Sequence, residues 1–433
     1  MSNVSIVVAV KSCRSWLGAA LLVAASAMSP AQAATVTVPV FDISASAKYK
    51  DVAQPPKVAW VGDHEFVAVW GQLSPGSTDA DGRWDLMMRR FNDSGAPLTG
   101  EIRIANAHQL FAFDASMAIR AVDAGHYVVA WVDSDTSTGA GFDLYGQVFN
   151  LDGSAASLRF PIDTVFDDNQ VFPSIIPGPS GQFAVIYRST DATSDGADIY
   201  AQRFSMAGRP VGSDVRINTV TSGLQSRPAA DCDLKGHCLV VWNSSASADG
   251  STPFEIKGQY VTPSLNMIGS EFLISNDLPD SSSIPAVGMD GAQNAVVGWI
   301  TFNSSTQHSN RVEFARYRPN HSFKNGNTLT ADGVEPDSTA FVGIMPTGEH
   351  GFFYSMENKT RSQLFVKDYT ATGAIVSTSK LADVAKTSTL FVGSSIAVNA
   401  AGRAVVTWQE YPASGSDTAS YFRGAILQGF GTP

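Results

Sequence analysis

Seven times along the chain, a short run of apolar residues ends in an aromatic residue. These aromatic landmarks are Trp70, Trp131, Tyr187, Trp242, Trp299, Tyr354 and Trp408, and neighbouring ones lie 54–61 residues apart. Internal repeats at a fixed spacing are typical of solenoids, arrays and propellers, and a repeat of this size built from several short strands is typical of a propeller blade. We number the repeats as units 1 to 7, after their aromatic landmarks.

Other positions keep the same phase. Fourteen residues before each aromatic landmark the chain enters another apolar run, at Pro56, Met117, Pro173, Pro228, Pro285, Ala340 and Ser394. A second aromatic follows downstream at Phe91, Phe149, Phe204, Tyr260, Tyr317 and Tyr369, with Ile426 in unit 7. Glycine lies four residues after it in four units, whereas units 4 and 5 have Ser264 and His321, so we expect those two turns to differ.

Each unit contains the pattern of four strands. In unit 1 the first follows the proline, and the second, residues 66–70, is apolar at every position. A run apolar on both faces indicates a strand buried on both sides. The third strand alternates, as in residues 199–204, and the fourth, as in residues 210–218, is more polar, which suits an outer edge. The pattern predicts an all-β, seven-bladed propeller of four-stranded antiparallel blades.

The last unit lacks a fourth strand, because only seven residues follow Ile426. The segment 36–43 has the composition and the phase of the missing strand. We therefore predict that this N-terminal strand pairs into the last blade and closes the ring. Closure removes the unpaired edges that an open array would expose.

Composition agrees with one large β domain over residues 34–433. The chain has 37 glycines, 44% hydrophobic residues and only 16% charged residues, and no linker or low-complexity tract interrupts the repeats. A propeller of this length is one domain rather than two or three.

Residues 1–33 have the features of a signal peptide. Lys11 and Arg14 precede an apolar stretch over residues 16–28, and Ala31 and Ala33 form a small-residue cleavage pattern. A membrane anchor is the alternative, but about 13 apolar residues are too few to span a bilayer. We expect an extracytoplasmic protein, periplasmic or secreted, with no membrane span.

Two cysteines remain beyond this segment. Cys232 and Cys238 flank a turn between the first two strands of unit 4, where opposed positions come close enough to bridge. We predict a disulfide, which an oxidising compartment would keep, with metal binding or free thiols as the alternatives. Its short loop limits the stabilisation to about 2 kcal/mol.

Charge restricts the partners. The chain has 40 acidic and 29 basic residues and a net charge of −11. A nucleic-acid binder would present a basic face, yet the sequence has no basic cluster beyond Arg89 and Arg90, so we expect no nucleic-acid partner. A local basic patch for an acidic ligand is still compatible with this balance, because ring closure gathers residues from distant units.

Loops between second and third strands are rich in Asp, Asn, Ser and Gly. Oxygen ligands at alternate positions suit calcium, but turns need the same residues, and no loop matches the twelve-residue calcium motif. We predict no metal site and no cofactor, and we keep weak calcium binding as the alternative.

No established catalytic motif is present: Gly-x-Ser-x-Gly, His-Glu-x-x-His and phosphate-binding glycine loops are all missing. The seven histidines are scattered. His64, His126, His237 and His350 fall in or beside turns between first and second strands, which a repeated turn position explains. His108 differs, because it lies between units 1 and 2 at the opposite end of the ring.

That opposite end is the expected ligand face, where connections between blades meet the loops joining second to third strands. Candidate ligand-binding residues there are Gln72, Asp133, Arg227, Asp337 and Glu410. His108, Tyr187 and Arg188 are candidate catalytic residues, as base, acid and charge-neutralising group for removing a proton beside a sugar carboxylate. Tyr187 is also an aromatic landmark, so packing between blades is its alternative role.

The repeat resembles a known family. Residues 181–187, 198–204 and 208–212, which read GQFAVIY, DIYAQRF and GRPVG, are similar to the blade repeat of uncharacterised secreted bacterial β-propeller proteins. The resemblance covers nearly all of the chain beyond residue 33 and implies the fold and export, without a catalytic motif.

Two functional classes stay open. The first is an exported propeller that acts as a binding scaffold for a glycan, a peptide or a protein, and we expect it to be a monomer because a closed ring has no structural need for a partner. The alternative is a polysaccharide-degrading enzyme, a lyase acting on an acidic glycan. The fold alone does not choose between them. A binder should have a shallow face with exposed aromatics, and an enzyme a deep pocket with convergent polar groups.

Overall fold

The computed structural model describes twenty segments of the chain. They are residues 35–45, 48–49, 54–75, 83–107, 117–134, 141–162, 169–179, 181–190, 196–233, 235–275, 279–291, 293–303, 309–328, 343–344, 350–357, 361–369, 375–385, 389–399, 401–412 and 419–429. The predicted signal peptide, residues 1–33, lies outside them. Every described regular element is a strand, β1 to β29.

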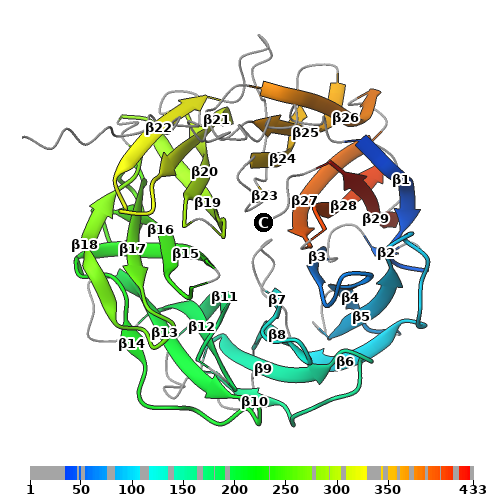
Figure 1. Ribbon diagram of the computed structural model, residues 1–433, viewed down its shortest axis with the longest axis horizontal. Helices are drawn as coiled ribbons and strands as arrows, with labels where there is room; N and C mark the ends of the chain where they lie inside the picture. Colours follow the sequence, from blue (N-terminus) through cyan, green and yellow to red (C-terminus); the bar gives the residue numbers. More distant parts are fainter. Residues whose placement is uncertain are drawn as a thin grey trace, which may run out of the picture.

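The sheets of units 1, 2, 5 and 6 have four strands each and are antiparallel. They comprise β3 (Gln54–Trp60), β4 (Glu65–Leu73), β5 (Trp84–Asn92) and β6 (Ile102–Ala107); β7 (Met117–Ala121), β8 (His126–Asp133), β9 (Asp143–Asn150) and β10 (Phe160–Pro161); β19 (Ser281–Met289), β20 (Ala295–Phe302), β21 (Ser309–Tyr317) and β22 (Phe323–Thr328); and β23 (Gly343–Ile344), β24 (His350–Glu357), β25 (Arg361–Tyr369) and β26 (Ile375–Ala385). Figure 1 shows the sheets arranged around a centre, with the first strand of each unit innermost.

Units 3 and 4 share one eight-stranded sheet. It contains β11 (Gln170–Pro177), β12 (Gln182–Ser189), β13 (Gly196–Ser205), β14 (Val215–Arg216), β15 (Gly223–Cys232), β16 (Cys238–Ser245), β17 (Glu255–Val261) and β18 (Met267–Leu273). The two halves meet where β13 pairs with β15 in parallel. The structure therefore has a propeller arrangement of four-stranded antiparallel sheets, but the sheet count by itself does not confirm seven separate blades.

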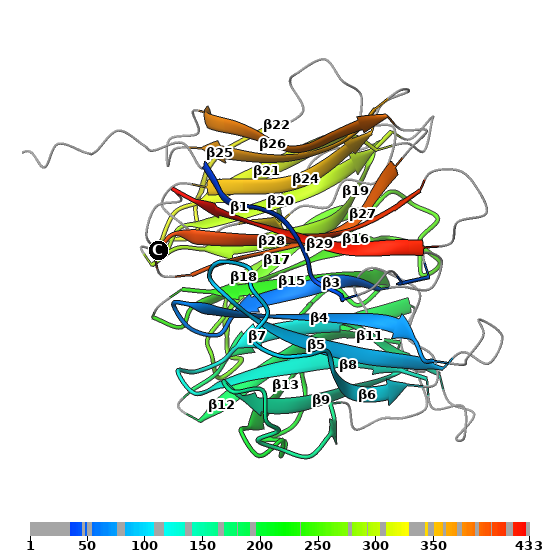
Figure 2. The ribbon, with the colours of Figure 1, turned by 90° about the vertical axis from the view of Figure 1, so that its right-hand side faces the viewer.

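The N-terminal strand pairs with the last strand of the chain, as predicted. β1 (Thr35–Asp42) runs antiparallel to β29 (Ala419–Gln428), which continues through β28 (Arg403–Pro412) to β27 (Thr389–Val398), while β2 (Lys48–Tyr49) also pairs with β29. Figure 2 shows β1 in blue lying beside β29 in red, so that the two ends of the described chain share one sheet.

The core lies between neighbouring sheets, and the predicted second strands supply most of it. Val67, Val69 and Trp131, from units 1 and 2, are fully buried in one cluster. Burial on both faces explains why these strands are apolar at successive positions.

Of the two turns that lack the repeated glycine, the turn of unit 4 is shifted, because its left-handed residue is Leu265 (φ 65°), one position after Ser264. In unit 5, His321 (φ 64°) keeps the left-handed conformation that Gly95 (φ 75°) adopts in unit 1, so the backbone difference expected there is wrong. Stacking of the His321 ring on Tyr260, at 3.7 Å between ring centroids, accompanies this conformation in unit 5.

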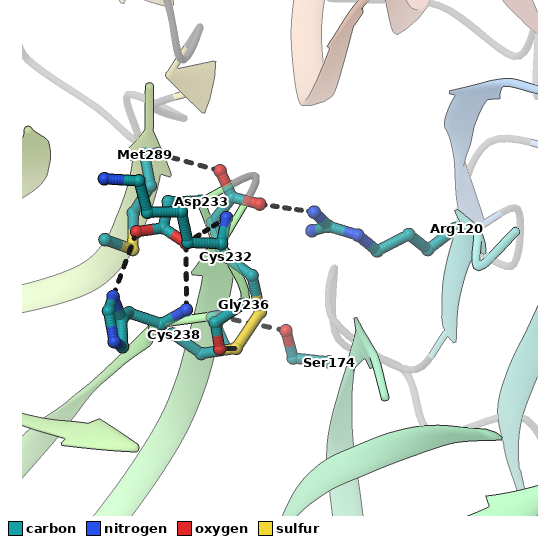
Figure 3. Close-up of a disulfide and its surroundings, with 11 residues drawn as sticks. Arg120, Ser174, Cys232, Asp233, Gly236, Cys238 and Met289 are labelled. Atoms are coloured by element: carbon teal, nitrogen blue, oxygen red, sulfur yellow. Dashed lines mark hydrogen bonds and ion pairs between the residues drawn. A yellow bond between two sulfur atoms is a disulfide. The ribbon is translucent and has the colours of Figure 1, made fainter. Parts of the chain in front are cut away.

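The predicted disulfide is present. Cys232 and Cys238 are bonded and stand opposite each other in the β15–β16 ladder. Figure 3 shows the bond closing this hairpin, with Ser174 and Met289 of neighbouring units close by. Within the described residues, no helix is long and apolar enough to cross a bilayer.

Candidate functional site at the centre of the sheets

The innermost strands surround a cavity of about 510 Å³. Its wall comes from six of them: β3, β7, β11, β15, β19 and β27. Each strand contributes residues at or next to the position that lies fourteen residues before its aromatic landmark. Figure 1 shows these strands innermost, around the centre of the molecule. A concave site lined by apolar side chains and a few charged groups is where a small ligand or part of a polymer binds.

The charged residues of the cavity wall are three bases and one acid: Lys57, Arg120, Arg227 and Asp231. This local excess of positive charge contrasts with the net charge of −11 of the whole chain. Low-dielectric walls concentrate such a field, so the centre of the molecule favours anions even though the protein as a whole is acidic.

Arg120 and Asp231 form an ion pair between units 2 and 4. The Arg120 guanidinium donates to Asp231 Oδ1 at 2.5 Å, and the Met289 amide of unit 5 donates to Asp231 Oδ2 at 2.8 Å. Figure 3 shows Arg120 extending from its own strand toward the disulfide hairpin.

Arg227 has an unusual backbone conformation. Its φ is 50°, and it immediately precedes Pro228. Phe172 (φ 60°) and Ile284 (φ 54°) take the same conformation directly before Pro173 and Pro285. Non-glycine residues rarely have positive φ, and such strain is found preferentially at functional sites. The β11, β15 and β19 ladders all shift register here, and a bulge of this kind redirects a side chain.

Arg188 of β12 lies close to Arg227. Burial lowers the pKa of Arg188, and the positive charge of Arg227 lowers it further. The Arg188 Nε is buried and has no hydrogen-bond partner. The Arg227 guanidinium carbon lies 5.0 Å from the centroid of the Phe172 ring, a cation–π contact that holds it at the sheet edge.

We call this region, formed by Arg188, Arg227 and the β13–β15 pairing, the arginine junction. Two guanidinium groups that repel each other while one is desolvated are costly unless an anion joins them. A carboxylate is the natural partner, because its two oxygens match the planar donors of a guanidinium.

Tyr187, the predicted acid, is buried and 2% exposed. Its hydroxyl donates to Asp214 Oδ2 at 3.1 Å, and its ring stacks on Tyr200 with 6.4 Å between centroids. These contacts give Tyr187 the packing role that its landmark position offered as the alternative. The predicted base, His108, lies outside the described residues, as does Asp337.

Gln72 and Asp133 have partners within the protein. Gln72 Oε1 accepts the indole N–H of Trp70 at 3.1 Å. Asp133 is 2% exposed and accepts from Arg159 at 2.9 Å. Both interactions stay within a single unit, which favours a structural role for these two residues over contact with a ligand.

Glu410 is half-buried in unit 7. Arg423 Nε donates to Glu410 Oε1 at 2.7 Å, and Arg423 also pairs with Asp42 of β1. Burial raises the pKa of Glu410 above its usual value. Glu410 therefore links β28 to β29 through its hydrogen bond with Arg423.

Among the predicted ligand-face residues that the structure describes, it therefore brings together only Arg188 and Arg227. Sequence reasoning missed Lys57, Arg120 and Asp231. The sequence did contain a signal for them, namely a charged residue in an otherwise apolar first strand. Lys57 follows Pro56 by one position, and Arg120 and Asp231 follow Met117 and Pro228 by three. In the described segments, no group of three or more His, Cys, Asp or Glu residues is arranged to hold a metal.

No protein-family model matches the chain, and no curated protein sequence matches it. Solved structures do match in fold. An ulvan lyase of polysaccharide lyase family PL25, bound to a GlcA(1-4)Rha3S ligand, aligns with a TM-score of 0.63 at 10% identity, over 89% of this chain and 96% of the lyase. The polysaccharide lyase Uly1 aligns with a TM-score of 0.57 at 9% identity, over 91% and 100% of the two chains.

A protein of unknown function from Dyadobacter fermentans DSM 18053 also aligns, with a TM-score of 0.50 at 10% identity, over 90% of this chain and 99% of that one. At such identities the likeness establishes the fold alone. The disulfide and the glycan-active neighbours are compatible with an extracytoplasmic location.

Proposed function

We propose that the protein is a polysaccharide-degrading enzyme, a lyase that acts on an acidic glycan. The observation that carries the proposal is the arginine junction, where Arg188 and Arg227 repel each other beside a central cavity with a positive wall. A uronate carboxylate placed between them would relieve this repulsion and supply the missing partner of Arg188 Nε.

Binding a carboxylate in this way also prepares an elimination. Neutralising its charge makes the neighbouring C5 proton more acidic, because the carboxylate can then take up electron density from the carbanion. A base removes that proton, the electron pair forms the C4–C5 double bond, and the C4–O bond to the leaving sugar breaks. The leaving oxygen takes up a proton, so the products are an unsaturated uronate and a sugar with a free hydroxyl.

The described residues contribute the charge-neutralising part of this chemistry. We assign Arg188 and Arg227 to carboxylate binding, and the wall residue Lys57 to orienting a more distant acidic group. His108 stays our candidate for the base. Tyr187 is a weaker candidate for the acid, because its hydroxyl already donates to Asp214.

We further propose that the eight-stranded sheet consists of two blades, so that the seven repeats make seven blades. On this proposal the pairing of β1 with β29 closes the ring. Residues 1–33 would direct export and be removed, and the enzyme would act in the periplasm or outside the cell.

The test is incubation of the purified protein with acidic and neutral polysaccharides, followed by ultraviolet absorbance of the unsaturated product. Turnover of an acidic glycan by the wild type, its loss in Arg188→Gln and its retention in Arg203→Gln would support the proposal. Arg203 is a matched control, because it lies on β13 of the same unit but pairs with Ala184 near the opposite end of β12. Tight binding of an acidic glycan with no unsaturated product would instead identify a binding scaffold.

A further inference from the structure

The pairing of β13 with β15 differs from the other strand pairings of the described residues. Gly196 pairs with Gly223 and Ala197 with Leu224, in parallel, whereas the remaining ladders are antiparallel. This glycine bridge joins the start of the third strand of unit 3 to the start of the innermost strand of unit 4. It therefore links neighbouring units at the arginine junction by main-chain pairing as well as by side chains.

Both positions require glycine. Gly223 has φ +83°, and a Cβ placed on it would lie 2.1 Å from the carbonyl oxygen of Ser245. Gly196 has φ +143°, and a Cβ there would lie 2.1 Å from the carbonyl oxygen of Gly223. The obstacles are main-chain atoms, which cannot rotate away as the end of a side chain can. Alanine at Gly196 must therefore open the bridge directly, and alanine at Gly223 must push the start of β15 away from β16 and so displace its half of the bridge.

The bridge lies close to both arginines along their strands. Arg227 follows Gly223 by four residues on β15. Arg188 is paired with Ile199, which follows Gly196 by three residues on β13. The segment between is well fixed, because Gln225 is fully buried and accepts the indole N–H of Trp242 at 3.1 Å.

We propose that Gly196 and Gly223 are positioning residues for the carboxylate site. Their bridge fixes β15, which carries Arg227, to β13, which is the ladder partner of the Arg188-bearing strand β12, and so opposes the repulsion between the guanidinium groups. The site for a sugar carboxylate then exists before the ligand arrives, which spares the ligand the cost of assembling it. The identity of the ligand in this inference rests on the proposed function. The coupling between the glycine bridge and the two arginines does not depend on it.

The test compares Gly223→Ala and Gly196→Ala with Gly181→Ala. Gly181 is a matched control, because its φ of +73° imposes a similar backbone strain on alanine while a Cβ there would meet nothing within 4 Å. It lies in the β11–β12 turn, away from the bridge. The measurements are amide hydrogen exchange over residues 223–227 and the affinity for tetragalacturonate, used as a defined acidic probe.

We expect both bridge variants to exchange faster over residues 223–227 and to bind the probe about tenfold or more weakly, because small displacements of binding groups are costly. The control should keep the affinity and the exchange of the wild type. In the double variant Gly223→Ala, Arg188→Gln, the losses of affinity should not add, since both changes act on one site. Additive losses, or an equal loss in the control, would overturn the inference.

A second measurement covers the case in which the alanine variants do not fold. Arg188→Gln alone removes the repulsion across the junction and should slow exchange over residues 223–227 relative to wild type; unchanged exchange would contradict the coupling. If the wild type binds no acidic oligosaccharide while exchange still responds as expected, the proposed function fails and the coupling stands.

Discussion

Two junctions between neighbouring sheets satisfy their polar groups in different ways. At the terminal junction, where the β27–β29 sheet meets the β3–β6 sheet, Trp60 Nε1 donates to the carbonyl of Ala397 at 3.0 Å, and Thr407 Oγ1 donates to that of Pro56, also at 3.0 Å. At the arginine junction, Arg188 Nε is buried without a partner. The hydrogen bonds of the first junction link two sheets directly, whereas the second junction contains a buried guanidinium nitrogen without a hydrogen-bond partner.

Charges at the terminal junction are also paired. Asp93 accepts from His64 at 2.7 Å and from Arg403 at 2.5 Å, so one carboxylate compensates the cation of the neighbouring sheet. The comparison shows why an interface that joins the two ends of a chain can serve stability alone. An interface that keeps two like charges close together lowers the stability of the fold. Such an arrangement is typical of functional sites, and here we infer ligand binding.

The largest effect should come from Arg188→Gln. Hydrogen bonds to charged groups contribute about 1.5–3 kcal/mol, so affinity for an acidic oligosaccharide should fall by roughly 10–100-fold. Thermal stability should stay the same or rise, because a desolvated cation is removed. Isothermal titration and thermal unfolding check the two parts. A large fall in the unfolding temperature would instead show that Arg188 is paired in the folded state.

The second-largest effect should come from removal of the disulfide. This bond closes the hairpin at the end of β15 opposite to Gly223, so replacing Cys232 and Cys238 together by serine should reduce the free energy of unfolding by about 2 kcal/mol, the loop-closure entropy of a short loop. Denaturant unfolding of the double variant, beside wild type under reducing conditions, measures this. Affinity for the acidic probe should be unchanged, and a loss of affinity would mean that the hairpin also positions Arg227.

At the terminal junction, Thr407→Val should cost about 1 kcal/mol. Thr407 is fully buried, and the substitution keeps its shape while leaving the Pro56 carbonyl without this donor. Chemical denaturation of the variant and the wild type measures this difference in the free energy of unfolding. Because Thr407 is in unit 7 whereas Arg188 and Arg227 are in units 3 and 4, binding of acidic oligosaccharides should change far less than in Arg188→Gln, which separates the two junctions experimentally.

The smallest effect concerns pH. Hydrogen bonds from His64 and Arg403 lower the pKa of Asp93 below its usual value of 3.8. A depressed folded-state pKa gives stability that is present above the unfolded-state value and is lost as the pH falls through the folded-state value. Asp93→Asn should therefore be slightly less stable than wild type at neutral pH, and the difference should vanish in strong acid. A difference that persists there would have another cause.

The repeat pattern predicted the all-β fold, the inner-to-outer order of strands and the pairing of β1 with β29, because each rests on the spacing of apolar residues. The disulfide was predictable for the same reason, since Cys232 and Cys238 flank a short turn. These features follow from local rules, namely the two-residue period of strands and the geometry of hairpins.

The site depended on tertiary structure. Asp133 and Arg188 follow their aromatic landmarks by two and one positions, yet the first is paired with Arg159 and the second faces another cation. No local rule distinguishes them, because the partner of each comes from a different strand or unit. The parallel bridge between Gly196 and Gly223 was equally invisible, since either glycine alone suggests an ordinary turn.

The sequence by itself determined which strands form and in what order they lie, because burial of alternating or continuous apolar residues leaves few other arrangements. Only the tertiary structure decided which charges remain uncompensated, because electrostatic energy depends on distances between residues far apart in the chain and on how deeply each is buried. For this protein that decision falls at Arg188, whose Nε is buried without a hydrogen-bond partner where two units meet.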